Sequence, residues 1–249
     1  MKKPVSHTTK MKFMWMNGFI KGILMLLRVD ILLGWMAKPL IKVSNAINMV
    51  RFVKRYGKTA VHNDFFVFRR DYNNRYRLYD FVIDNVKEAE IDYMEFGVAN
   101  AASFKYWLDN YKNKQSRFYG FDTFEGIPEN WGKFKKGEMA ASIPSVSDDR
   151  AHFIKGLFQD TLPDFLISGK LVPGRRKIIH IDCDLFSATL YVLTNLNSYL
   201  KQGDILLFDE FNVPDHEFSA FNMYLESYYK SVKMIGATNN YLQVAFEMI

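Results

Sequence analysis

Two short apolar runs, each followed closely by acidic residues, constrain the fold of this chain more than any other feature. The first run is Lys177–Asp182, and Asp184 lies two residues beyond it. The second is Asp204–Phe208, and Asp209 and Glu210 follow it directly. Continuous rather than alternating apolar character is typical of strands buried on both faces of a parallel sheet. Because isolated carboxylates are costly to bury, these acidic residues indicate a metal and proton-transfer site at the strand ends.

From about Tyr76 onward, short apolar runs alternate with amphipathic stretches. This alternation predicts an α/β fold with a doubly wound, Rossmann-like, mostly parallel sheet. The expected strands are Ile91–Gly97, Arg117–Asp122, His152–Gly156, Lys177–Asp182 and Asp204–Phe208, and the expected helices are Tyr76–Val86, Ala101–Lys112 and Ser187–Leu200.

The last part of the chain predicts a different kind of strand pairing. Val232–Thr238 and Tyr241–Met248 are apolar and flank Asn239 and Asn240, residues that tolerate positive φ and suit a tight turn. We therefore expect the sheet to end in an antiparallel hairpin, which is not the usual arrangement of a dinucleotide dehydrogenase.

The N-terminal segment, residues 1–60, differs from residues 61–249, which we expect to form the α/β domain. Up to Lys58 it carries twelve lysines and arginines and one acidic residue, Asp30, among many apolar side chains. These charges interrupt the apolar stretch, which argues against a spanning helix and a signal peptide. A basic, amphipathic helical extension is predicted instead. Two interpretations of residues 1–58 remain open: peripheral contact with an anionic membrane surface, or packing on the main domain or on a second subunit of a homo-oligomer.

Composition narrows the classes of function. Hydrophobic residues make up 49% and charged residues 24% of the 249 positions, as in an ordinary globular protein. The single cysteine, Cys183, excludes an intramolecular disulfide and a cysteine-based zinc cluster. We therefore expect a cytoplasmic protein, peripheral at the inner membrane surface if the basic segment binds lipid. The net charge of +6 is largely N-terminal, and no motif points to a nucleic-acid partner.

A single glycine follows the first predicted strand. Gly97 stands where dinucleotide-binding loops carry three glycines, so the expected ligand is nucleoside-like and lacks phosphates. Asp122 ends the second predicted strand, where a carboxylate can accept hydrogen bonds from both ribose hydroxyls. A turn aspartate is the alternative interpretation of Asp122.

Several motifs together resemble one known family. They are Glu95-Phe-Gly97, Gly120-Phe-Asp-Thr-Phe-Glu-Gly-Ile-Pro128, Gly156-Leu-Phe-Gln-Asp-Thr-Leu-Pro163, His180-Ile-Asp-Cys-Asp-Leu-Phe-Ser187 and Phe208-Asp-Glu-Phe211. In this order they resemble the macrocin O-methyltransferases, which are class I S-adenosylmethionine-dependent enzymes that methylate sugar hydroxyls. The resemblance extends from Tyr76 to Ile249 and leaves out the basic N-terminal segment.

The resemblance implies a set of cofactor-binding residues. Glu95 and Gly97 would border the methionine part of S-adenosylmethionine, and Ser103 would meet its carboxylate at a helix N-terminus, which suits an anion. Asp122 would hold the ribose. Asp160, in the turn that begins at Gly156, would lie near the adenine.

The resemblance also implies a metal and a base. Asp182, Asp209 and Glu210 would bind the metal, and Asp184 would act as general base toward a small-molecule or glycan acceptor. Three carboxylates suit Mg²⁺ better than zinc, which favours histidine and cysteine. Many relatives carry aspartate where this chain has Glu210, so the geometry of the metal site depends on Glu210.

Other side chains near these motifs have weaker assignments. Trp131, Phe124 and Tyr119 are candidates for the acceptor pocket, although core packing is the commoner role of such aromatic residues. The stretch from Trp131 to Asp149 is expected to be a long loop and a candidate lid. His180 is predicted to be a buried, hydrogen-bonded histidine, and His216 to lie in a loop.

The sequence leaves three alternatives to a sugar O-methyltransferase. A catechol-type phenolic O-methyltransferase also needs vicinal oxygens beside a metal. A non-catalytic protein that binds a nucleoside or associates with a membrane could keep the sheet without turnover. A nicotinamide dehydrogenase is disfavoured, because the glycine-rich turn is missing.

Overall fold

The computed structural model describes residues 7–86, 89–130 and 133–249. The chain divides into two compact units, Met1–Asn45 and Ala46–Ile249. In the first unit, helix α1 (His7–Leu26) ends at a turn where Arg28 has a φ of 48°, and helix α2 (Val29–Tyr56) begins directly after it. Within the described part of the chain, no helix is both long and apolar enough to cross a membrane.

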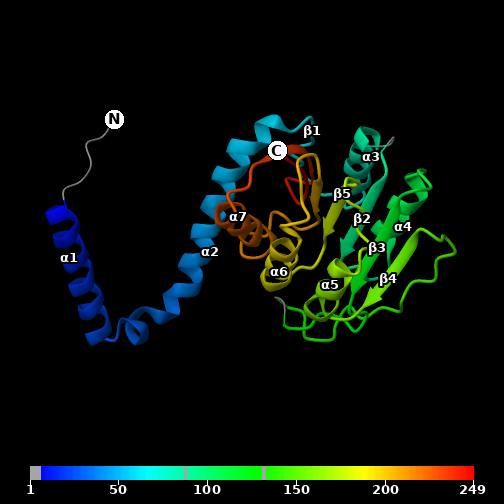
Figure 1. Ribbon diagram of the computed structural model, residues 1–249. Helices are drawn as coiled ribbons and strands as arrows, with labels where there is room; N and C mark the ends of the chain where they lie inside the picture. The colour runs from blue at the N-terminus through cyan, green and yellow to red at the C-terminus, as the bar shows by residue number, and fades with distance from the viewer. Residues whose placement is uncertain (1–6, 87–88, 131–132) are drawn as a thin grey trace. The chain divides into compact units, whose positions relative to one another are not determined.

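The second unit is built on an eight-stranded sheet with the order β1-β7-β8-β6-β5-β2-β3-β4 (Figure 1). Strand β8 runs antiparallel to both of its neighbours, β6 and β7, and the other neighbouring pairs are parallel. The strands are β1 (His62–Asn63), β2 (Ile91–Phe96), β3 (Arg117–Asp122), β4 (Ala151–Lys155), β5 (Arg176–Ile181), β6 (Ile205–Phe208), β7 (Val232–Thr238) and β8 (Gln243–Met248).

Helices cover both faces of this sheet. Helices α3 (Asn74–Val86) and α4 (Ala102–Asn110) pack on one face, and α5 (Phe158–Ile167), α6 (Phe186–Leu196) and α7 (Glu217–Ser227) pack on the other. Strand β2 alternates between the two cores: Met94 and Phe96 join the α5–α7 side, while Tyr93 joins the α3–α4 side. This double burial is the reason for the continuous apolar runs.

The predicted fold class is confirmed, and every helix and strand expected from the sequence is present with its ends shifted by a few residues. The largest shift is in α6, which ends at Leu196 instead of Leu200. The elements that were not expected are β1, the short 3-10 helix Gly57–Thr59, α5 and α7. The predicted hairpin is present, and its turn is longer than two residues because Asn239, Asn240 and Tyr241 all adopt positive φ.

The order of the strands indicates which edge of the sheet can bind a ligand. Strand β2 pairs with β3 on one side and with β5 on the other, so the chain reverses its direction of winding between β2 and β5. In open α/β sheets, ligands bind outside the carboxyl ends of the strands at such a reversal. The segments that follow β2, β3, β5 and β6 therefore meet at one edge.

Candidate active site

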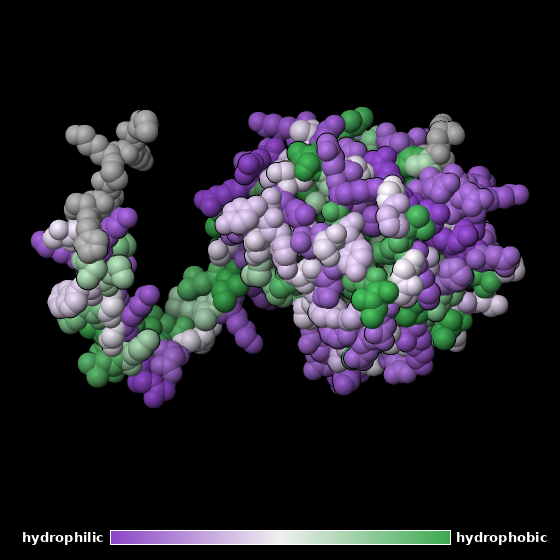
Figure 2. Space-filling model, in the orientation of Figure 1, coloured by the Kyte–Doolittle hydropathy of each residue, from purple (hydrophilic) through white to green (hydrophobic). Residues whose placement is uncertain are grey.

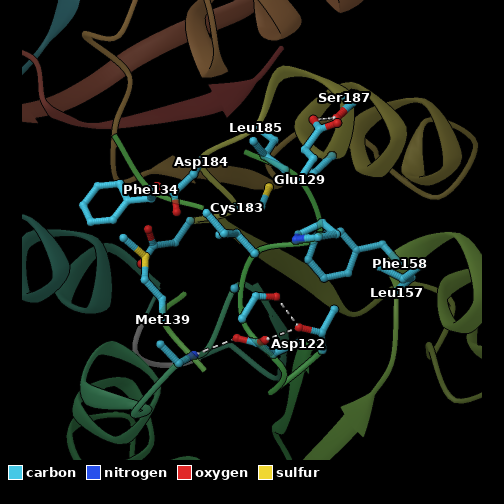
Figure 3. Close-up of a pocket in the computed structure, with 18 of the residues that line it drawn as sticks. Asp122, Glu129, Phe134, Met139, Leu157, Phe158, Cys183, Asp184, Leu185 and Ser187 are labelled. Carbon is cyan, nitrogen blue, oxygen red and sulfur yellow. Dashed lines mark hydrogen bonds between the residues drawn. The ribbon is translucent and has the colours of Figure 1, made fainter. Parts of the chain in front are cut away.

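A pocket of about 670 Å³ opens at this edge of the sheet (Figure 3). This volume is within the usual range for a small-molecule site. The segments that follow β2, β3, β5 and β6 all contribute lining residues, as do the long loop after β3 and the start of α5. Its lining includes Gly97, Ala99, Asp122, Thr123, Glu129, Phe134, Met139, Leu157, Phe158, Gln159, Asp182, Cys183, Asp184, Ser187 and Glu210, together with Tyr72.

Gly97 lies where the backbones of β2 and β5 approach each other after the strands end. Its φ is +91°, and a Cβ atom at this position would stand 1.9 Å from the carbonyl oxygen of Asp182. Only glycine combines this φ with such a close approach at low cost. Gly97 therefore shapes the floor of the pocket by allowing the chain after β2 to pass against the chain after β5.

Asp122 lines the pocket and also braces the loop after β2. One carboxylate oxygen accepts hydrogen bonds from the backbone N–H groups of Val98 and Ala99, both at 2.8 Å, and the other accepts one from Phe124 N–H at 2.8 Å. These bonds fit the interpretation of Asp122 as a turn aspartate. Its assignment to the ribose stays a prediction, since a carboxylate that accepts backbone bonds can still offer lone pairs to a ligand.

Glu95 and Ser103 lie behind the pocket and do not line it. Both are buried, and the Ser103 hydroxyl donates a hydrogen bond of 2.8 Å to Glu95 Oε1. Tyr93 donates to the other carboxylate oxygen of Glu95. Ser103 is within the first turn of α4, and its hydroxyl donates its proton to Glu95 and not to a ligand. Their assignment to the cofactor stays a prediction.

Helix α5 supplies the far wall of the pocket. Leu157, Phe158 and Gln159 line it at the start of this helix, whereas Asp160 is exposed and is not among the lining residues. Figure 3 shows Leu157, Phe158 and Asp122 around the same cavity. A pocket that combines an apolar wall with a carboxylate suits a small molecule such as a nucleoside. The resemblance led to Asp160; the pocket instead presents the three residues before it.

Asp184 stands in the opposite part of the pocket. It has a φ of 59°, a left-handed conformation that is uncommon outside glycine and often occurs at functional sites. Burial and the neighbouring carboxyls of Glu210 and Asp209 raise the pKa of Asp184 to about 7. A carboxylate with a pKa near neutrality is suited to take a proton at physiological pH.

Asp182 and Glu210 face the same cavity as Asp184. Burial raises the pKa of Asp182 well above its usual value, and the carboxyls of Asp209 and Asp184 raise it further. Burial and Asp209 also raise the pKa of Glu210, an effect that the cation of Arg70 partly opposes. Like charges held together in this way are stabilised by a bound cation.

Asp209, in contrast, is turned away from the cavity and is held by protein groups. The hydroxyl of Tyr72 donates a hydrogen bond to its Oδ2, and Tyr79 donates one of 3.2 Å to its Oδ1. Arg75 forms an ion pair with Asp209 at 3.6 Å. No pattern in the sequence points to Tyr72, Tyr79 or Arg75, because Tyr72 lies between β1 and α3, and the other two lie on α3, far from Asp209 in the chain.

The donor chemistry of this acidic set fits a hard cation. Glu217 adds a fifth carboxyl: its Oε2 accepts the backbone N–H of Glu210 at 3.0 Å, and its buried Oε1 has no hydrogen-bond partner among the described residues. An unpartnered buried carboxylate oxygen is costly unless it is protonated or meets a cation. Among the described residues, no three histidine, cysteine or acidic side chains are already gathered closely enough to hold a metal ion.

The remaining candidates have clear positions. Tyr119 and Phe124 pack in the core and do not line the pocket, so they are not acceptor-site residues, and Trp131 lies outside the described residues. His180 is buried between the hydroxyls of Tyr93 at 2.8 Å and Tyr79 at 3.3 Å, which confirms the expected buried, hydrogen-bonded histidine.

The long loop after β3 reaches the pocket, as its predicted role as a lid requires. Phe134 and Met139 from this loop line the cavity, and Ser187 at the start of α6 donates a hydrogen bond of 3.1 Å to Glu129 (Figure 3). This bond links the loop to the segment that carries Asp184.

Comparison with known proteins agrees with this geometry. Residues 94–211, which run from β2 to the end of the acidic set, match the methyltransferase domain family. Among curated proteins, a Streptomyces olivaceus enzyme named 8-demethyl-8-(2,3-dimethoxy-alpha-L-rhamnosyl)-tetracenomycin-C 4'-O-methyltransferase is 27% identical over 117 residues. That similarity covers 39% of this chain and 42% of the relative, so it spans less than half of the relative's length.

Solved structures show the same fold. The calicheamicin methyltransferase CalS11 has a TM-score of 0.58 and 18% identity, and the similarity covers 82% of this chain and 91% of that one. The O-methyltransferase NovP has a TM-score of 0.52 and 19% identity, covering 71% and 78% of the two chains.

Proposed function

We propose that this chain, which belongs to the class I S-adenosylmethionine-dependent O-methyltransferases of the macrocin type, transfers a methyl group to a hydroxyl of a sugar or glycosylated metabolite. One observation carries the proposal most directly. A single pocket is lined by Asp122 and Phe158, which we assign to the nucleoside, and by Asp184, which we assign to the acceptor. The curated relative, whose name describes methylation of a rhamnosyl group, supports a sugar acceptor.

The proposed reaction assigns separate roles to the two parts of the pocket. Asp122 and the wall formed by Leu157 and Phe158 hold the nucleoside of S-adenosylmethionine, so that its methyl group points toward Asp184. The acceptor oxygen forms a bond to the methyl carbon while the sulfur–carbon bond breaks, and S-adenosylhomocysteine leaves as a neutral thioether. Asp184 takes the hydroxyl proton, a role that its raised pKa supports.

The carboxylates around Asp184 are proposed to bind a metal ion. Asp182, Asp209 and Glu210 would hold Mg²⁺, with Asp182 and Glu210 already facing the cavity. When bound, such a cation orients vicinal hydroxyls and lowers the cost of removing a proton from one of them. Because the Tyr72 hydroxyl donates to Oδ2 of Asp209, Asp209 would join this set by sharing or releasing that bond.

Calorimetry and mass spectrometry test this function together. We expect S-adenosylmethionine to bind the purified protein with or without Mg²⁺. We also expect the product of a reaction with rhamnosylated acceptors to gain the mass of one methyl group. Catechol acceptors, assayed in parallel, test the phenolic alternative. A protein that binds neither S-adenosylmethionine nor S-adenosylhomocysteine would contradict the proposal.

The metal part of the proposal predicts a change in stability. Mg²⁺ should raise the unfolding temperature of the metal-free protein, because a cation that binds only the folded state stabilises it by about 2.7 kcal/mol at a hundredfold excess over its Kd. Asp182→Asn should remove most of this increase. Asp109→Asn, which neutralises an exposed aspartate on α4, should retain it. Differential scanning calorimetry in MgCl₂ and in NaCl of equal ionic strength measures both effects, and an equal increase in both variants would argue against this site.

A further inference from the structure

The N-terminal unit presents an unusually apolar surface. Nineteen large hydrophobic side chains between Met11 and Val43 are at least 38% exposed, and Leu26, at 82%, is the most exposed of them. Figure 2 shows hydrophobic surface gathered on these helices. Soluble proteins rarely expose so much contiguous apolar surface unless it serves an interaction.

The polar and aromatic side chains of α1 are only partly separated. Lys10, Asn17 and Lys21 recur at spacings of seven and four residues, which places them on one face of the helix. Trp15 and Phe19 lie on the opposite face, where their rings stack with centroids 5.8 Å apart. Lys12, three residues before Trp15, lies on the same side as Trp15 and Phe19. Basic helices that carry exposed tryptophan and phenylalanine are typical of the membrane interface.

The positive charge of this unit indicates that the surface it binds is anionic. Residues 7–45 carry six lysines and arginines against one acidic residue, Asp30, which is paired with Arg28 at 3.0 Å. Cations attract anionic lipid headgroups, while the apolar face enters the boundary of the acyl chains. The scattered charges also explain why α1 and α2 do not qualify as spanning helices.

The second unit carries a similar combination of side chains next to the pocket. Phe65, Phe66 and Phe68 are 59%, 65% and 99% exposed, and the exposed Arg69 and Arg70 follow them. We refer to Phe65–Arg70 as the aromatic segment.

Two observations place the aromatic segment beside the active site. Its backbone is fixed to the hairpin turn by two hydrogen bonds between Val67 and the side chain of Asn240, at 2.9 and 2.8 Å. Two residues after Arg70, Tyr72 lines the pocket.

We propose that residues 7–45 and the aromatic segment bind the surface of an anionic lipid bilayer, and that the enzyme works on acceptors presented there. The first part concerns binding alone and does not depend on methyl transfer. The second part rests on the proposed function. It identifies the acceptor class as glycans carried on a lipid, because the aromatic segment adjoins the pocket and would bring its entrance to the bilayer.

Sedimentation with vesicles tests the binding, with the full chain and no methyl donor. We expect binding to vesicles of phosphatidylcholine with phosphatidylglycerol, and at least tenfold weaker binding to phosphatidylcholine alone. Lys10→Glu with Lys21→Glu should reduce binding to anionic vesicles at least tenfold. Lys105→Glu with Lys233→Glu changes the total charge equally at exposed positions of the second unit and should have little effect.

Variants of the apolar side chains separate lipid from protein partners. Trp15→Ser with Phe19→Ser, and Phe65→Ser with Phe68→Ser, should each weaken vesicle binding while the unfolding temperature stays unchanged. Light scattering should find the same oligomeric state for these variants and the unchanged protein. Absence of vesicle binding, or a homo-oligomer that Trp15→Ser with Phe19→Ser dissociates, would overturn the membrane proposal and leave the methyltransferase proposal intact.

Discussion

Asp184→Asn should lower the rate of methyl transfer by about 10²- to 10⁴-fold, the contribution typical of general base catalysis. Asparagine keeps the size and polarity of the side chain but cannot take a proton. Asp184 is the pocket carboxyl whose pKa is raised to about 7. The substitution leaves Asp122, the residue that we assign to the cofactor, in place. The affinity for S-adenosylmethionine should therefore remain within about twofold, whereas kcat falls.

The matched control is Asp164→Asn on α5. It makes the same chemical change at an exposed aspartate that does not line the pocket, so the rate should stay unchanged. Rapid-quench measurements of methylated product, combined with calorimetric titration of S-adenosylmethionine, separate chemistry from binding. If Asp184→Asn and Asp164→Asn transfer methyl groups at the same rate, Asp184 is not the base.

The acidic set illustrates what the sequence could predict. Asp182 and Asp184 follow β5, Glu210 follows β6, and these strands are parallel neighbours in register from Ile178 with Ile205 to Ile181 with Phe208. Residues that follow adjacent parallel strands must meet at one edge of the sheet. Two buried apolar runs that end in carboxylates were therefore enough to predict that these side chains share a site.

The side chains that contact the acidic set could not be predicted from the sequence. Tyr72 and Arg75 contact Asp209 from more than a hundred positions away in the chain, and no local pattern marks such a pairing. Glu217 begins α7, a helix that was not expected, and its carboxylate folds back onto the Glu210 backbone. Long-range contacts of this kind depend on how loops and helices pack, which short-range periodicity does not encode.

Helix α5 is a second feature that the sequence did not predict. Its interior contains Pro163, which removes a backbone donor and normally disfavours a helix. Burial of Leu162 and Phe165 against the sheet outweighs this local cost. As a result, the segment expected as a turn near the adenine is a helix, and it presents Phe158 instead of Asp160 to the pocket.

Gly97→Ala is expected to be the most damaging glycine-to-alanine change among the described residues. The added Cβ would lie 1.9 Å from the Asp182 carbonyl oxygen, which belongs to the backbone and cannot rotate away. A φ of +91° adds about 1–2 kcal/mol of strain for any residue with a Cβ. We expect a total loss of more than about 3 kcal/mol in the free energy of unfolding, comparable to the costliest packing changes.

Gly174→Ala separates the collision from the backbone strain. Gly174 has a nearly identical φ of +88°, but nothing lies within 4 Å of the position of its Cβ. This variant should lose only the 1–2 kcal/mol of strain and bind S-adenosylmethionine normally. In Gly97→Ala, relief of the collision must move the chain after β2 away from Asp182, and the affinity for S-adenosylmethionine should fall at least about 100-fold, or 2.7 kcal/mol. Urea unfolding and calorimetric titration of both variants give the comparison. Equal losses of stability with equal affinities would mean that the pocket does not depend on the close approach of β2 and β5 at Gly97.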